Sequence, residues 1–242
     1  MEKIIAVIPA RYQSSRFPGK PLALIAGEPM IQHVYERVRQ VECIERVVVA
    51  TDDERILKHV QSFGGEAVLT GECGCGTERV YEAVRGNEYS IVINVQGDEP
   101  LIRPQMIKEL IDTMVKKNVP MATLCRELTD REDVINPNIV KVIMDLQGNA
   151  VYFSRNPIPY NRDNIAGVRY FKHIGMYGYR KDFLEQYVHM PKSPLECAES
   201  LEQLRVLENG YKIAIAETQY DSIGVDLPEH IKQIEEILKN EK

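Results

Sequence analysis

Short apolar runs rich in β-branched residues alternate with amphipathic stretches through the first half of the chain. Residues 4–8 form a buried-strand run, and further strands are expected at 46–50, 67–69 and 90–95. Helical spacing marks residues 30–41, 56–63, 77–84 and 104–115. Strands and helices that alternate at this spacing imply right-handed crossovers. The pattern therefore predicts a mostly parallel sheet with helices on both faces.

The second half of the chain is richer in strands. Residues 138–145 and 150–155 are expected to pair as a hairpin through the turn at 146–149. A strand at 175–179, a helix at 195–208, a strand at 211–216 and a closing helix at 228–239 follow. We expect one α/β domain over residues 1–242, with an embedded β-rich lobe at about residues 136–160.

Composition excludes several classes of protein. With 44% hydrophobic and 27% charged residues, the 242-residue chain has the composition of a soluble globular protein. No apolar run reaches the ~20 residues of a membrane span, so no membrane insertion is expected. The net charge of -6 argues against nucleic acid as a partner. Five cysteines, an odd number, favour reduced thiols in the cytoplasm.

A basic loop, residues 9–22, follows the first strand and carries Arg11, Arg16 and Lys20 among serines and glycine. Each close exposed pair of cations would repel by ~1 kcal/mol, so an anion is expected between them. Arginine offers a planar fork and lysine a point charge for phosphate oxygens. A solvated basic loop is the alternative, and neither a Walker A loop nor a Gly-x-Gly-x-x-Gly motif is present.

Two aspartates are candidate ligands for a divalent cation. Asp98 follows the strand at 90–95, and its carboxylate is expected to face the same crevice as the basic loop. That place suits Mg²⁺ bridging to phosphate oxygens, although Asp98 could instead cap a turn. Asp226 precedes Leu227-Pro228, where an aspartate also commonly caps a helix.

The segment Pro9 to Leu22 resembles the signature of the sugar-activating cytidylyltransferases. The likeness is greatest to the 3-deoxy-manno-octulosonate (Kdo) cytidylyltransferases, or CMP-Kdo synthetases, since relatives that activate sialic acids usually have Lys-Asn where this chain has Lys20-Pro21. The likeness runs from end to end of the chain. Further matching segments are residues 50–52, 96–100, 121–124, 136–138, 152–159, 172–180, 201–205 and 224–229.

This resemblance implies a Rossmann-like nucleotide-diphospho-sugar transferase fold, with a mixed, mostly parallel sheet and a small β-rich dimerisation lobe in a homodimer. It also implies that CTP and a 3-deoxy-ulosonic acid, most closely Kdo, give a CMP-sugar and pyrophosphate for lipopolysaccharide biosynthesis. In the family the two aspartate motifs supply the Mg²⁺ ligands, and this role falls on Asp98 and Asp226.

The resemblance further assigns roles residue by residue. Catalysis falls to Lys20, Asp98, Arg11 and Arg16. Nucleotide binding falls to Ala10, Arg11, Ser14, Lys20, Gly76, Thr77, Arg79, Gln96 and Asp98. Sugar binding falls to Gln96, Arg155, His173, Tyr177, Glu199, Glu202 and Gln203. Taken alone, His173 would be interpreted as a packed structural histidine.

Three cysteines depart from the family pattern. Cys73, Cys75 and Cys197 stand where the family usually has His, Ser and His. The change could indicate a different sugar, a site for a soft metal ion, or a neutral replacement by a small side chain.

Other functions are also open from the sequence. One is a cytidylyltransferase for another ulosonic acid, such as an amino-Kdo or a sialic-like sugar. A glycosyltransferase would usually carry Asp-x-Asp, whereas this chain has Gln-Gly-Asp-Glu at 96–99. A non-catalytic relative would be expected to lack Lys20, Asp98 or Asp226, and all three are present.

Overall fold

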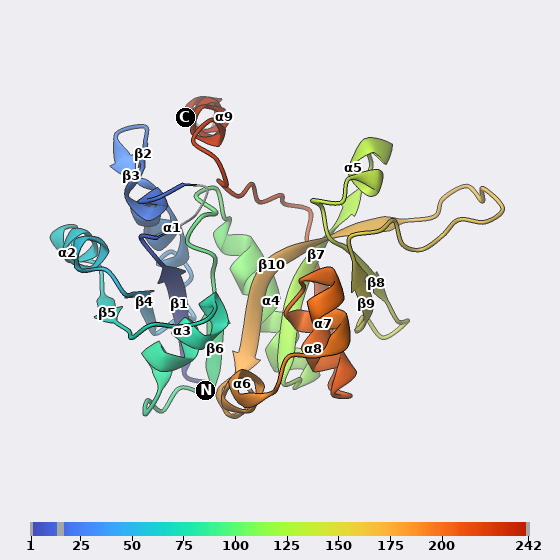
Figure 1. Cartoon of the computed structure of the whole chain (residues 1–242), viewed down its shortest axis with the longest axis horizontal. Helices are drawn as coiled ribbons and strands as arrows, with labels where there is room; N and C mark the ends of the chain where they lie inside the picture. Colours follow the sequence, from blue (N-terminus) through green and yellow to red (C-terminus); the bar gives the residue numbers. More distant parts are fainter. Residues whose placement is uncertain (1, 14–16, 241–242) are drawn as a thin grey trace. The chain divides into compact units, whose positions relative to one another are not determined.

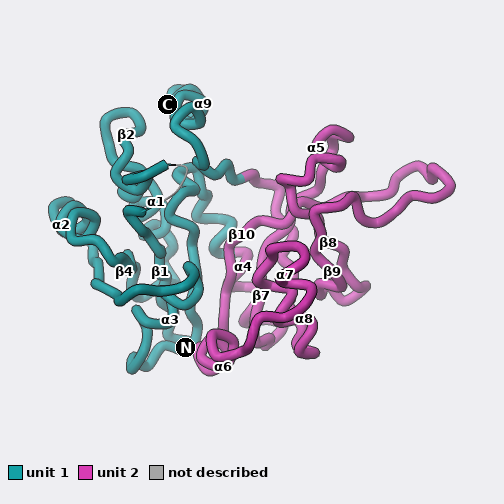
Figure 2. The backbone as a smooth tube through the Cα atoms, viewed as in Figure 1, with its two compact units in different colours: residues 1–108, 222–242 teal, residues 109–221 magenta. Residues whose placement is uncertain are grey.

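The chain folds into two compact units, shown in different colours in Figure 2. The computed structural model describes residues 2–13 and 17–240. Unit 1 comprises residues 1–108 and 222–242, and unit 2 comprises residues 109–221. The single domain expected from the sequence stays a prediction. Over the described residues, no helix combines the length and the apolar character needed to cross a bilayer.

Unit 1 is built on parallel strands in the order β6-β1-β4-β5. Residues 5–8 of β1 are almost fully buried, because strands of a parallel sheet are covered on both faces. Helices α1 and α3 both pack on β1. The strands are β1 (Ile4–Ala10), β4 (Arg46–Thr51), β5 (Ala67–Leu69) and β6 (Ile91–Asn94). The helices are α1 (Met30–Val38), α2 (Glu54–Ser62), α3 (Gly76–Val84) and α9 (His230–Asn240).

A short 3-10 helix and a small hairpin follow the basic loop of unit 1. The 3-10 helix η1 (Lys20–Leu22) leads into β2 (Leu24–Ile25), which pairs antiparallel with β3 (Glu28–Pro29). Helix α9 packs on β2, so the end of the chain covers the segment that follows Lys20. Helix α4 (Pro104–Lys117) then carries the chain from unit 1 into unit 2.

Unit 2 contains both parallel and antiparallel strand pairs. Strand β7 (Met121–Leu128) pairs parallel with β11 (Ile213–Glu217) and antiparallel with the long β10 (Tyr170–Arg180). Strand β8 (Lys141–Met144) pairs with β10 and forms the expected hairpin with β9 (Ala150–Ser154). The loop between β9 and β10 projects away from these strands (Figure 1). The helices of unit 2 are α5 (Arg131–Ile135), α6 (Lys181–His189), α7 (Pro194–Glu199) and α8 (Gln203–Glu208).

The predicted class, a mixed and mostly parallel α/β fold, is confirmed, while one predicted helix is wrong. The expected helix at 195–208 is two helices, α7 and α8. Ser200 ends α7 in the left-handed conformation, with φ 54° and ψ 49°, and so interrupts the helical backbone. Strand β10 extends well beyond the predicted 175–179, and β7 and α6 were not among the predicted elements.

Candidate active site

A backbone hydrogen bond joins two described residues of the basic loop after β1, Tyr12 and Gly19. The Gly19 N–H donates to the carbonyl of Tyr12 (2.8 Å). Gly19 has φ 73°, a conformation that glycine adopts without a steric penalty. A Cβ on Gly19 would lie 3.1 Å from the Tyr12 ring, so the ring packs directly on the glycine. The predicted Ser14 and Arg16 lie outside the described residues.

Lys20 brings together the two aspartates that were selected from the sequence. Its Nζ lies 2.5 Å from Asp98 Oδ2 and 4.0 Å from Asp226 Oδ1. The Val225 N–H also donates to the Asp98 carbonyl (2.9 Å), which holds the two aspartate segments side by side. Residues 20, 98 and 226 therefore form one polar site in unit 1.

The donor set at this site fits a hard divalent cation. Carboxylate oxygens are the protein ligands that Mg²⁺ prefers, and Mg²⁺ commonly takes its other oxygens from substrate phosphates and water. Across the described chain, no group of three or more His, Cys, Asp or Glu side chains could hold a metal ion. Asp98 and Asp226 thus suit an ion that arrives with phosphate ligands of its own, and Lys20 adds a cation for the same phosphates.

A cavity of about 940 Å³ lies in unit 1 beside the basic loop. This volume is within the usual range for small-molecule sites, which is roughly 300–1,000 Å³. Its lining residues are Arg11, Tyr12, Gln13, Pro18, Asp52, Asp53, Arg55, Glu72, Cys73 and Arg79. Two of them, Arg11 and Arg79, were predicted from the sequence to bind nucleotide.

Arg79 is buried and held in a fixed orientation. Its guanidinium donates to Asp52 Oδ2 (2.6 Å) and to Thr70 Oγ1 (2.5 Å), and its side chain is only 5% exposed. Arg79 lies near the start of α3, whose first residues Gly76 and Thr77 were also predicted to meet the nucleotide. Two hydrogen-bonded partners reduce the freedom of the guanidinium, so any ligand in the cavity meets a donor of defined direction.

Tyr12 and Arg55 also line this cavity and are in contact with each other. The guanidinium carbon of Arg55 lies 3.3 Å from the centre of the Tyr12 ring. The same guanidinium donates to both carboxylate oxygens of Asp53, the N-cap of α2. Tyr12 is therefore packed between Arg55 and Gly19, which links the basic loop to the start of α2.

In unit 2, Arg155 and Glu199 are joined closely. The Arg155 N–H and the Ser154 hydroxyl each donate to one carboxylate oxygen of Glu199, at 3.0 and 2.6 Å. The Arg155 Nε donates to the Glu199 carbonyl (2.9 Å). Glu199 thus fixes the backbone and the guanidinium of Arg155.

The other predicted sugar residues of unit 2 form a chain of contacts. His173 Nε2 lies 3.0 Å from Thr123 Oγ1, and the His173 and Tyr177 rings are 5.6 Å apart. Tyr177 Oη donates to Gln203 Oε1 (3.2 Å). Burial lowers the pKa of His173 to about 3, so its imidazole is neutral near pH 7. Glu202 accepts a hydrogen bond from Tyr187 through its backbone carbonyl.

Ala10 and Gln96, the remaining predicted residues, lie in unit 1. Ala10 ends β1 and is buried. Gln96 follows β6, with its Nε2 3.5 Å from Asn94 Oδ1. Both positions are at the carboxyl ends of parallel strands, where ligands of open α/β sheets bind.

Lys141, which was not predicted from the sequence, supports the backbone of Arg155. It is fully buried in β8, and its Nζ donates to the carbonyls of Asn136, Ile139 and Arg155 at 2.9, 2.7 and 2.5 Å. Burial lowers its pKa. A lysine within the apolar run Ile139 to Ile143 was the available signal, since a buried charge needs such partners.

Cys73 and Cys197, two of the cysteines that depart from the family pattern, have different surroundings. Cys73 lines the 940 Å³ cavity, and burial raises the pKa of its thiol, so it is protonated and neutral. Cys197 is exposed in α7.

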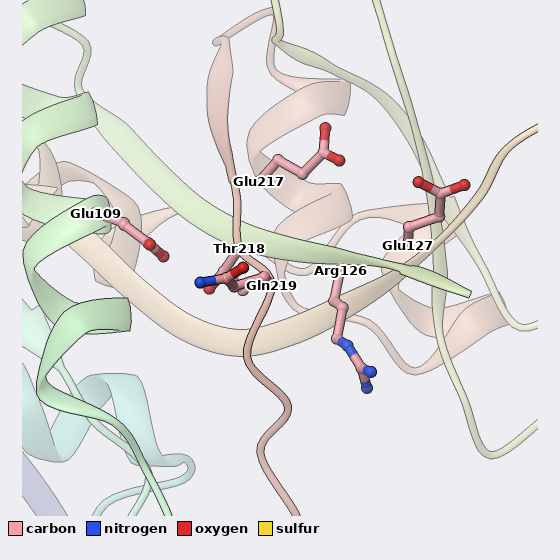
Figure 3. Close-up of a pocket in the computed structure, with 6 residues that line it drawn as sticks. All are labelled: Glu109, Arg126, Glu127, Glu217, Thr218 and Gln219. Carbon is pink, nitrogen blue, oxygen red and sulfur yellow. The ribbon is translucent and has the colours of Figure 1, made fainter. Parts of the chain in front are cut away.

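A second cavity, of about 490 Å³, lies in unit 2 and is lined by none of the predicted residues (Figure 3). Successive residues of β7, Arg126 and Glu127, point to opposite sides of the strand. Arg169 is paired with Glu127 and Glu217, and Arg126 with Asp221. The remaining lining residues are Glu109, Thr218 and Gln219.

Comparison with known proteins identifies the family and agrees with the fold. The sequence profile of the family described as cytidylyltransferase matches residues 5–213. The 3-deoxy-manno-octulosonate cytidylyltransferase of Thermodesulfovibrio yellowstonii is 51% identical, covering 97% of both chains. That of Syntrophotalea carbinolica is 50% identical, covering 98% of both. The chain therefore belongs to the cytidylyltransferase family.

Solved structures give the same result. A CMP:2-keto-3-deoxy-manno-octonic acid synthetase complexed with CTP is 45% identical and superposes with a TM-score of 0.95 over 100% of both chains. A 4-diphosphocytidyl-2C-methyl-D-erythritol synthase from Anaerococcus prevotii is 16% identical with a TM-score of 0.65, which shows a shared fold. The relatives that match over nearly their full length are named 3-deoxy-manno-octulosonate cytidylyltransferases.

Proposed function

We propose that this chain transfers CMP from CTP to Kdo, giving CMP-Kdo and pyrophosphate. The anomeric hydroxyl of the sugar attacks the α-phosphorus, a new O–P bond forms, and the bond to the pyrophosphate oxygen breaks. Relatives at 46–51% identity carry the Kdo name, and the structure with a TM-score of 0.95 is a complex with CTP. The observation that carries the proposal is Lys20 lying between Asp98 and Asp226.

The residues of unit 1 act mainly by positioning and by neutralising charge, which is what phosphoryl and nucleotidyl transfer requires of a protein. Lys20 and Arg11, together with Arg16, hold the triphosphate and stabilise the leaving pyrophosphate. Asp98 and Asp226 would hold Mg²⁺. When bound, Mg²⁺ neutralises charge at the α-phosphate and lowers the pKa of the attacking hydroxyl. Arg79 donates to the nucleotide base from the orientation set by Asp52 and Thr70.

The residues of unit 2 would orient the acceptor sugar. Arg155 supplies a cation for the sugar carboxylate, and its contacts with Glu199 define where that cation lies. His173, with its pKa lowered to about 3, exchanges hydrogen bonds with sugar hydroxyls as a neutral ring. Tyr177, Glu202 and Gln203 complete the contacts that unit 2 offers to the sugar.

We further propose that the enzyme works as a homodimer in the cytoplasm and supplies CMP-Kdo for lipopolysaccharide. The cytoplasm is where CTP is made available, and the five cysteines form no disulfide among the described residues. The dimer is supported by apolar side chains exposed between residues 135 and 165.

The decisive experiment measures pyrophosphate release from CTP and Kdo. Asp98→Ala should lower turnover by about 100-fold or more, because it removes a group that stabilises charge in the transition state. Asp112→Ala, an exposed aspartate of α4, is the matched control and should retain wild-type turnover. Circular dichroism should show the same fold for both variants. Wild-type turnover by Asp98→Ala would refute the proposed role, and inactivity of the wild type with Kdo would refute the substrate.

A further inference from the structure

Two hydrogen bonds join the segment that carries Asp98 to the segment that carries Asp226. The Ser222 hydroxyl donates to Glu99 Oε2 (2.6 Å), and the Val225 N–H donates to the Asp98 carbonyl (2.9 Å). Ser222 is 6% exposed and Val225 is fully buried. Glu99 is the neighbour of Asp98, and Ser222 lies four residues before Asp226. The side-chain bond thus ties the segment that leads to Asp226 to the residue next to Asp98.

The other side of Asp226 is anchored by the C-terminal helix. Ile234 of α9 is fully buried in an apolar cluster with Ile25 of β2, Met30 and Val225. The backbone N–H of Ala26 also donates to Glu235 Oε1 (2.9 Å). Helix α9 is therefore fastened to the hairpin that directly follows Lys20, and Asp226 lies between two attachments.

Asp226 needs such attachments because it lies outside any regular element and is 51% exposed. Two carboxylates brought to one site also repel each other, so the fold must hold them together. Groups hydrogen-bonded beside metal ligands commonly set the direction of those ligands, and their loss typically costs about 10–100-fold in metal affinity.

We infer that the Ser222–Glu99 hydrogen bond is a positioning contact that holds Asp226 in register with Asp98 and Lys20 for divalent-cation binding. This inference rests on the proposed function, because it takes the two aspartates as the cation ligands. Ser222 and Glu99 act through the aspartates and need no contact with substrate.

The test is Mn²⁺ binding in the presence of CTP and without sugar, followed by electron paramagnetic resonance. Ser222→Ala and Glu99→Ala should each weaken Mn²⁺ binding by about tenfold. Glu99→Gln should stay within about twofold of the wild type, because its amide oxygen still accepts from the Ser222 hydroxyl. Ser90→Ala removes a serine of unit 1 that donates to the Lys3 carbonyl, and it is the matched control with unchanged binding.

CTP binding in the presence of a chelator separates positioning from damage to the nucleotide site. It should be the same for the wild type and for Ser222→Ala, and thermal melts should show that both are folded. Mn²⁺ affinity of Ser222→Ala equal to that of a Mn²⁺-binding wild type would overturn this inference alone. An equal loss in Glu99→Gln and Glu99→Ala would also overturn it, since charge rather than the hydrogen bond would then matter. A wild type that binds no Mn²⁺ with CTP would overturn the proposed metal role and this inference together.

Discussion

Lys20 depends on the backbone conformation of one neighbour. Gly19 adopts φ 73°, packs against the Tyr12 ring and closes the basic loop through its N–H. Lys20 follows directly as the first residue of η1 and reaches Asp98. The position of the Lys20 ammonium, which the proposed reaction needs, therefore depends on Gly19, a residue without a side chain.

The positions of Lys20, Asp98 and Asp226 could be proposed from the sequence because each lies in a segment with a recognisable motif. The orientation of Arg79 could not, since Asp52 and Thr70 come from other loops and a single sequence does not show which side chains meet. The carbonyl partners of Lys141 could not be predicted either, because two come from the turn at 136–139 and the third, Arg155, follows β9 and is brought there by packing.

His173 should make the stability of the protein depend on pH. Burial lowers its pKa to about 3 in the folded state, while an unfolded histidine has a pKa of roughly 6.5. The unfolded state therefore binds the proton more tightly. The contribution of neutral His173 to the free energy of unfolding is complete above pH 6.5. This contribution falls by ~1.4 kcal/mol per pH unit as the pH drops from there towards 3.

Urea unfolding of the wild type and of His173→Gln at pH 7 and pH 5 measures this effect. From pH 7 to pH 5, the free energy of unfolding of the wild type should fall by ~2 kcal/mol more than that of the variant, because glutamine takes up no proton. Other titrating groups are common to both chains and cancel in the difference. Equal losses would show that the pKa of His173 in the folded state is close to that in the unfolded state.

Among the elements, the strands β1, β4, β5 and β6 of unit 1 were predicted with nearly their observed bounds, while β7 of unit 2 was not predicted at all. The predicted β5 has the observed bounds, Ala67–Leu69, because its apolar run is bounded by polar residues. Strand β1 continues through Pro9 to Ala10, beyond the predicted end at residue 8. Pairing of β1 with β6 stops at Val7, so the missing N–H of Pro9 interrupts no ladder on that side.

The predicted helix at 195–208 fails for a reason that the sequence hides. Ser200 adopts the left-handed conformation that glycine usually provides at a helix end, and no glycine or proline marks the break. The N–H of Leu201 donates to the Glu196 carbonyl and closes α7. The backbone conformation of Ser200 therefore marks where this helix ends.

Helix α3 should become more stable when Cys75 is replaced by serine. Cys75 is its N-cap residue, in an extended conformation, and its side chain makes no capping hydrogen bond. Serine is a preferred N-cap because its oxygen accepts from a backbone N–H of the first turn. Cys75→Ser should raise the free energy of unfolding by ~0.5–1 kcal/mol.

Thermal unfolding of Cys75→Ser and of Cys73→Ser, a control outside the helix cap, checks this expectation. The melting temperature should rise by a few degrees only for the first variant. A fall in the melting temperature of Cys75→Ser would indicate that other contacts of the thiol outweigh the new cap.

On the scale of the whole molecule, several of the most exposed apolar side chains of the described chain fall between residues 135 and 165. Ile135, Leu146, Val151, Tyr160 and Ile165 are between 54% and 109% exposed and all belong to unit 2. The tip of the β9–β10 loop is nevertheless ordered by two hydrogen bonds between Asn161 and Ile165, each 2.9 Å. An ordered loop that presents apolar side chains to solvent is typical of an interaction surface.

We expect this surface to join two copies of the chain. The wild type should sediment with twice the mass of one 27.7 kDa chain at micromolar concentrations. The double variant Tyr160→Asp, Ile165→Asp should sediment as a single chain, because charges buried at an interface without partners are strongly unfavourable. Leu24→Asp, Leu69→Asp alters two exposed apolar residues of unit 1 and should leave the mass unchanged. A monomeric wild type would contradict the dimer. A double variant that keeps the doubled mass would show that the interface lies elsewhere in the chain.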